Sequence, residues 1–145
     1  MKRFFLVAIL FSVSNFAMAN EWTVAASNNQ SESKSPLTLN TTLNNQTASI
    51  ITTDSSGVPD NAKQLAPKSA VMFELDIPNG YINVLYTDVD KSIGCEFTFF
   101  KMEVRLPPPT GLQYIILLTN NPITKDSICT TTQTGGVNIL NVGSK

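Results

Sequence analysis

The sequence predicts an all-β protein of about 7–8 strands, folded as an antiparallel β-sandwich (immunoglobulin-like or jelly-roll-like) or as a small barrel. Two observations support this prediction. Apolar and polar residues alternate with the period of a strand in successive segments, and turn-forming residues separate those segments at short intervals. Beyond residue 19, no amphipathic run is long enough to form a packed helix.

The first nineteen residues have the pattern of a bacterial export signal. Lys2 and Arg3 precede an apolar run from Phe4 to Val13, and Ala17-Met18-Ala19 fits the rule for cleavage before Asn20. The apolar run is shorter than the ~20 residues that a membrane-spanning helix needs. We therefore expect residues 1–19 to be a signal peptide that is removed, and the rest of the chain to be periplasmic or secreted.

Length and charge limit the possible partners. The chain has 145 residues, which suits one domain. Lys2 and Arg3 account for two of the ten basic residues, so eight remain against eleven acidic residues, a net charge of −3 after cleavage. This dispersed acidic balance predicts no binding to nucleic acid or to an anionic membrane, and no later segment is apolar enough to span one.

Residues 20–58 are rich in Asn, Ser and Thr, a composition that permits disorder. Three segments in this region nevertheless have strand character: Trp22–Val24, the alternating Leu37–Leu43, and Ala48–Thr53. We expect the region to be partly flexible and to contribute edge strands to a sandwich core formed by residues 59–145.

The core region begins with a connector and a clear strand pair. Ser56–Ala70 contains Gly57, Pro59 and Pro67, with room for one helical turn at Asp60–Leu65. Val71–Ile77 and Tyr81–Thr87 then alternate around Pro78-Asn79-Gly80, a sequence that favours a tight turn. Val71–Thr87 is therefore predicted to be a β-hairpin.

The next predicted strand, Cys95–Arg105, changes phase in its middle. Cys95, Phe97 and Phe99 occupy one face, whereas Phe100, Met102 and Val104 occupy the other. We favour a β-bulge or bend at Phe99–Phe100, which would return both halves to one core. The alternative is a regular strand buried on both faces near its middle.

Three further strands are predicted after the prolines at 107–109. Leu112–Thr119 is apolar on both faces, as in a central strand. Ser127–Thr132 and Val137–Val142 follow, separated by the turn residues Gly135 and Gly136.

The two cysteines, Cys95 and Cys129, both lie in the exported part of the chain. An oxidising compartment favours their pairing, and two cysteines permit only one intramolecular bridge. We expect this disulfide, with two separate buried thiols as the alternative.

The sequence lacks the side chains that several catalytic mechanisms require. The chain has no histidine, which excludes Ser-His-Asp and Cys-His catalysis and His-based zinc sites. No Gly-rich phosphate loop is present, and we predict neither cofactor nor metal. A hydrolase would need two converging carboxylates, for which the candidates are polar-face positions on predicted strands: Glu74, Asp76, Glu96 and Glu103.

Exposed aromatic residues are the remaining candidates for a site. Trp22 lies near the new N-terminus, and Tyr81 and Tyr114 lie close to strand ends. Such side chains suit a glycan or a protein partner, or alternatively close one end of the core. The leading hypothesis is thus a small exported β-sandwich that acts by binding a protein or glycan, and not as an enzyme.

A second hypothesis is a structural subunit that assembles by strand exchange. The alternating Leu37–Leu43 segment in its polar arm resembles the donor strand of chaperone–usher pilins. Those subunits carry their disulfide early and have an aromatic residue near a patterned C-terminal strand. Here the cysteines are late and the chain ends Val-Gly-Ser-Lys, so the resemblance assigns no family.

Overall fold

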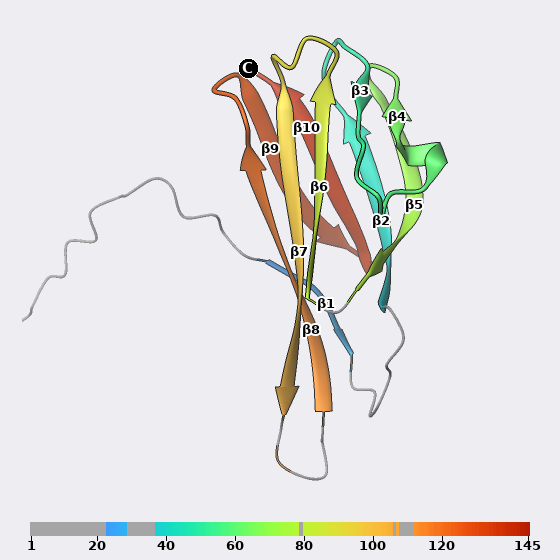
Figure 1. Cartoon of the computed structure of the whole chain (residues 1–145), viewed down its shortest axis with the longest axis vertical. Coiled ribbons are helices and arrows are strands. Elements are labelled where there is room, and N and C mark those ends of the chain that lie inside the picture. The colour runs from blue at the N-terminus through green and yellow to red at the C-terminus, as the bar shows by residue number, and fades with distance from the viewer. Residues whose placement is uncertain (1–22, 29–36, 79, 106, 108–111) are drawn as a thin grey trace, which may run out of the picture.

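The structure is a computed structural model that describes residues 23–28, 37–78, 80–105, 107 and 112–145. These residues form two β-sheets that enclose one hydrophobic core (Figure 1). Ten strands occur in the described residues, and eight of them have six residues or more. The predicted all-β sandwich with one disulfide is confirmed, and its separate sheets distinguish it from a closed barrel.

Sheet A contains six strands and sheet B contains four. The order in sheet A is β1 (Thr23–Asn28), β8 (Leu112–Pro122), β7 (Gly94–Arg105), β6 (Tyr81–Asp88), β3 (Ile51–Thr52) and β4 (Gln64–Leu65). The order in sheet B is β5 (Ser69–Ile77), β2 (Leu37–Asn45), β10 (Val137–Ser144) and β9 (Ser127–Thr134). All these pairings are antiparallel except β2 with β10, which is parallel.

The core is built from the inward positions of the alternating strands. In β2, Leu39 and Leu43 are buried while Thr38 and Asn40 are exposed, as the sequence predicts. Sheet A contributes large side chains from β6 and β7, of which Tyr86, Phe97 and Phe99 have no exposed surface. Burying such a side chain stabilises the fold by about 1.5–3 kcal/mol. Hydrophobic packing of these residues therefore contributes most of the stabilising contact between the sheets.

The segment Val71–Thr87 is not a hairpin, contrary to the sequence prediction. Its two strands, β5 and β6, have no ladder between them because β5 pairs with β2 in sheet B and β6 pairs with β7 in sheet A. The segment between Ile77 and Tyr81 therefore connects the two sheets. Both strands alternate because each has one face on the shared core, and this pattern is the same whether strands pair within a sheet or face across it.

Strand β7 contains no bulge, so the favoured prediction for Phe99–Phe100 is wrong. Its register with β6 and with β8 continues through both residues without a shift. Figure 1 shows β7 and β8 continuing past the lower ends of the other sandwich strands. The apolar residues change from the inward to the outward face of β7 because the strand extends beyond sheet B. Past that point, its inward face has no opposite sheet to pack against.

The short 3₁₀ helix η1 (Asp60–Ala62) occupies the connector where one helical turn was predicted. The Tyr86 hydroxyl donates a hydrogen bond of 2.9 Å to the Ala62 carbonyl, and burial raises the pKa of that phenol. This bond holds the connector against the inner face of sheet A.

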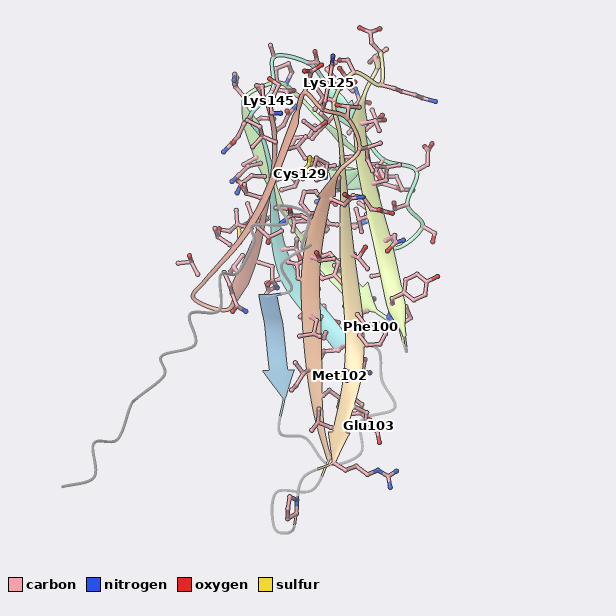
Figure 2. All side chains as sticks on the ribbon, turned by 90° about the vertical axis from the view of Figure 1, so that its left-hand side faces the viewer. Phe100, Met102, Glu103, Lys125, Cys129 and Lys145 are labelled. Atoms are coloured by element: carbon pink, nitrogen blue, oxygen red, sulfur yellow. A yellow bond between two sulfur atoms is a disulfide. The ribbon has the colours of Figure 1, made fainter. Side chains whose placement is uncertain are left out.

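The predicted disulfide is present. Cys95 of β7 bonds to Cys129 of β9, with 5.6 Å between their Cα atoms, and thus joins sheet A to sheet B. Figure 2 shows the bridge at Cys129 in the upper half of the sandwich. Because 34 positions separate the two cysteines, the bridge restricts a long loop of the unfolded chain.

Replacing both cysteines, by Cys95→Ala with Cys129→Ala, should lower the free energy of unfolding by roughly 3–4 kcal/mol, mainly because the unfolded chain gains entropy. Urea unfolding of the oxidised wild type and the double variant measures this difference, and reduced wild type serves as the control. A loss below about 1 kcal/mol would contradict the expected stabilisation of the fold by the disulfide.

Candidate recognition surface

The lower end of sheet A exposes a group of large apolar side chains. Tyr81 of β6 is 65% exposed, and Phe100 and Met102 of β7 are 38% and 37% exposed. Tyr81 lies directly opposite Phe100 in the β6–β7 ladder, so the two side chains project from the same face. Figure 2 shows Phe100 and Met102 in succession down β7.

The β8 strand extends this surface sideways. In the β7–β8 register, Leu117 lies opposite Phe100 and Ile115 lies opposite Met102, and both β8 side chains are half-buried. We call the resulting group the projecting apolar face, and it consists of outward residues from three adjacent strands: Tyr81, Phe100, Met102, Val104, Ile115 and Leu117. Single exposed apolar residues are normal, whereas a contiguous group of this kind is a candidate interaction surface.

A hollow of about 420 Å³ adjoins Tyr81 on the side of β6 away from β7. It combines an aromatic ring, a carboxylate and an amide, and its lining residues come from β5, β6 and the loop after β3: Ser56, Gly57, Asp76, Pro78, Tyr81, Ile82 and Asn83. The Thr38 hydroxyl donates a hydrogen bond of 2.6 Å to Asp76 Oδ1 and so orients that carboxylate. Two other hollows, of about 390 and 260 Å³, contain no aromatic side chain.

The backbone along this side of β6 is also open. The Leu85 N–H points away from β7 and donates a hydrogen bond of 3.1 Å to the Ser55 hydroxyl. Backbone groups alternate in direction along a strand, so those of Asn83 and Tyr81 point the same way, into the hollow. No other described strand pairs with β6 at these two residues. The hollow therefore offers backbone donors and acceptors beside an exposed ring.

Gly57 determines how closely the loop after β3 approaches β6. A Cβ atom at this position would overlap with Cδ1 of Ile82, so any larger residue requires that terminal methyl group to move. The glycine thus shapes the wall of the hollow.

The structure separates Tyr81 from Tyr114, the two described residues among the three aromatic residues predicted as a site. Tyr81 is exposed at the hollow. Tyr114 pairs with Glu103 and lies on the opposite face of β7–β8, where the Lys101 ammonium sits 4.4 Å from its ring centroid. This cation–π contact gives Tyr114 a structural role beside the buried Lys101. Trp22 lies outside the described residues.

Phe100 and Met102 are surface residues that were not predicted from the sequence. The signal was the change of phase after Phe99, which we attributed to a bulge that would return these side chains to the core. A strand that extends beyond the opposite sheet shows the same change of its apolar residues from one face to the other.

The four candidate carboxylates do not share a cleft. Glu74 and Asp76 are exposed on the outer face of β5 in sheet B, and Glu96 lies on the outer face of sheet A. Glu103 is exposed on the face of β7 opposite the projecting apolar face. Neither Glu96 nor Glu103 can therefore act together with the β5 pair on one substrate.

Comparison with known proteins assigns no family: no protein-family model, curated protein or solved structure matches the chain. In the described part of the chain, no helix is long and apolar enough to cross a membrane, and no group of three metal-ligating side chains is found.

The variant Gly57→Ala should lower the free energy of unfolding by about 1–3 kcal/mol, because the new methyl group displaces Ile82 or the loop. Thermal or urea unfolding measures the change. Ser56→Ala, at the exposed neighbouring position, is the matched control and should stay within about 0.5 kcal/mol of wild type. A gain in stability of about 0.4–1 kcal/mol, as expected for an unhindered Gly→Ala change, would contradict the close approach of the loop to β6.

Proposed function

We propose that this protein is exported and acts by binding a protein ligand, without catalysis, through the projecting apolar face and the hollow beside Tyr81. The observation that supports this most directly is the exposure of Tyr81, Phe100 and Met102 as neighbours on one face. Aromatic and methionine side chains are enriched where protein interfaces bury their central area.

Export is supported by two features of the chain. The Cys95–Cys129 disulfide is compatible with an oxidising compartment outside the cytoplasm, in the periplasm or beyond the cell. The predicted signal peptide, residues 1–19, points to the same destination, although these residues lie outside the described part of the structure.

A protein ligand fits this surface better than a glycan. Sugar sites usually combine an exposed ring with several polar groups, and Tyr81, Asp76 and Asn83 could supply such a set. The larger part of the surface, however, is apolar and belongs to strands β7 and β8. A hydrophobic area beside open backbone groups suits an extended polypeptide.

Alanine variants of the surface test this proposal in a binding screen of the chain from Asn20, against a glycan array and against envelope and secreted proteins. Tyr81→Ala and Met102→Ala should each weaken binding of the captured ligand about 10-fold or more. Met72→Ala is the matched control, because Met72 is more accessible than Met102 (65% against 37% exposed) but lies on the outer face of sheet B. Its affinity should stay unchanged.

Three results would count against the proposal. An equal loss of ligand affinity in Met102→Ala and Met72→Ala would show that the projecting apolar face is not the binding surface. Binding confined to the glycan array would replace the protein ligand with a glycan. Turnover of a captured substrate would replace binding with catalysis.

Assembly by strand exchange is a second candidate, and one observation favours it. Strand β2, from the polar N-terminal region, fills a central position in sheet B between β5 and β10. A strand in this position could be supplied by another copy of the chain. If it is, size-exclusion chromatography should show large, heat-stable assemblies, whereas a monomer with slow amide exchange at residues 37–43 would exclude this candidate.

The connection after β2 weighs against exchange. The Asn45 amide donates hydrogen bonds to the carbonyls of Ser49, Leu65 and Ala66, at 2.8–3.2 Å. Its carbonyl oxygen accepts a bond of 2.7 Å from the Thr47 hydroxyl. Moving β2 into another copy would break this buried network, whose polar groups would each lose a partner.

A further inference from the structure

Strand β7 extends beyond its neighbour β6 and leaves an open sheet edge. Tyr81, the first residue of β6, lies opposite Phe100, and just before it the Gly80 carbonyl accepts a hydrogen bond of 2.7 Å from the Lys101 N–H. From Met102 to Arg105, β7 pairs only with β8. These four residues form what we call the open β7 edge.

The direction of the free backbone groups follows from the Lys101 bond. Because the Lys101 N–H points toward the β6 side, the N–H and C=O groups of Glu103 and Arg105 point that way too. Those of Met102 and Val104 point toward β8 and join its ladder. No described strand pairs with the outward groups of Glu103 and Arg105.

In the described residues, the only protection of this edge against pairing with another strand is a pair of charged side chains, Glu103 and Arg105. Natural edge strands are protected by proline, by bulges, by covering loops or by charged side chains. The described part of β7 contains neither proline nor bulge. Glu103 and Arg105 are exposed on one face of the edge, with 3.5 Å between Oε1 and Nε, and their charges are opposite. The edge is therefore open to a strand whose charges complement this pair.

We propose that the open β7 edge pairs with the same edge of a second copy of this chain. The two β7 strands run antiparallel about a two-fold axis, and the two copies of sheet A become one continuous sheet. This is an isologous contact, in which each copy presents the same residues to the other. It does not depend on the proposed ligand.

Only one register between the two β7 strands avoids both steric overlap and like-charge pairs. In an antiparallel pair, residues with outward backbone groups can face only each other. Placing Glu103 opposite the second copy's Lys101 is blocked by the Gly80–Lys101 bond. Glu103 opposite Glu103, or Arg105 opposite Arg105, brings like charges together, which destabilises a cross-strand pair. Only Glu103 opposite Arg105 remains, and it occurs twice.

The selected register places Val104 opposite Val104 on the two-fold axis. It forms four backbone hydrogen bonds and two opposite-charge pairs over a short length of strand. Such a contact is smaller than a standard stable interface, so the association is reversible and depends on concentration. The axis is perpendicular to the sheet, so both projecting apolar faces lie side by side on the same side of the dimer.

Charge reversal tests the edge and its register together. The samples are the oxidised chain from Asn20, the variants Glu103→Arg and Arg105→Glu, and an equimolar mixture of the two variants. Sedimentation velocity between about 1 μM and about 1 mM measures self-association over the range expected for a weak interface. Glu74→Arg, an equal charge change on β5 of sheet B, is the matched control.

Wild type and Glu74→Arg should form a dimer as concentration rises. Each edge variant alone should associate about 10-fold or more weakly, because two opposite-charge pairs become two like-charge pairs. The mixture should recover a dimer, since the arginine introduced by Glu103→Arg in one chain then faces the glutamate introduced by Arg105→Glu in the other. Recovery cannot arise from misfolded variants.

Wild type that stays monomeric throughout this range would overturn the proposal. Variants that dimerise as well as wild type, or a mixture that fails to dimerise, would overturn it as well. Ligand binding by a monomeric chain would leave the proposed function standing, because no step of that binding uses the open β7 edge.

Discussion

The structure depends on the burial of the inward face of β7 against sheet B. Phe97 and Phe99 have no exposed surface, and Cys95 on the same face is bonded to Cys129 of the opposite sheet. These three positions fix which face of β7 meets the core. Since side chains alternate strictly along a strand, they also fix the direction of every other side chain on β7 and, through the ladders, on β6 and β8.

The surface features at the lower end of sheet A are consequences of this constraint. With Phe99 facing inward, Phe100 and Met102 must face outward, and the uninterrupted register gives them no route back to the core. The strand then continues beyond Tyr81, the first residue of β6, and exposes its backbone there. The apolar face and the open edge are therefore adjacent because one strand, longer than its neighbours, produces both.

Much of the fold follows from local patterns in the sequence. The strands at Leu37–Leu43, Val71–Ile77 and Cys95–Arg105 are predictable because each has one face on the core and alternates accordingly. The disulfide is predictable because only two cysteines exist. In contrast, only Ile51–Thr52 of the predicted Ala48–Thr53 segment forms a strand, β3, and β4, with two residues, is too short to produce a recognisable pattern.

The predictions that failed concern features that depend on segments distant in the sequence. The segment between Ile77 and Tyr81 connects two sheets, but its sequence, Pro-Asn-Gly, also suits a hairpin. The phase change in β7 depends on where sheet B ends, which the sequence of β7 does not encode. The same limit applies to the site: Tyr81 was identifiable as an aromatic residue near a strand end, whereas Phe100 and Met102 required the relative lengths of the strands.

Amide hydrogen exchange along β7, followed residue by residue by NMR at a dilution where the chain is monomeric, tests most directly that β7 is one unbroken strand. The account predicts slow exchange from Phe97 to Met102 and at Val104, with fast exchange at Glu103 and Arg105, whose N–H groups face the open edge. Fast exchange at Phe99 or Phe100 would indicate the bulge. Slow exchange at Glu103 and Arg105 with fast exchange at Met102 and Val104 would indicate the opposite register, and either result would contradict the account.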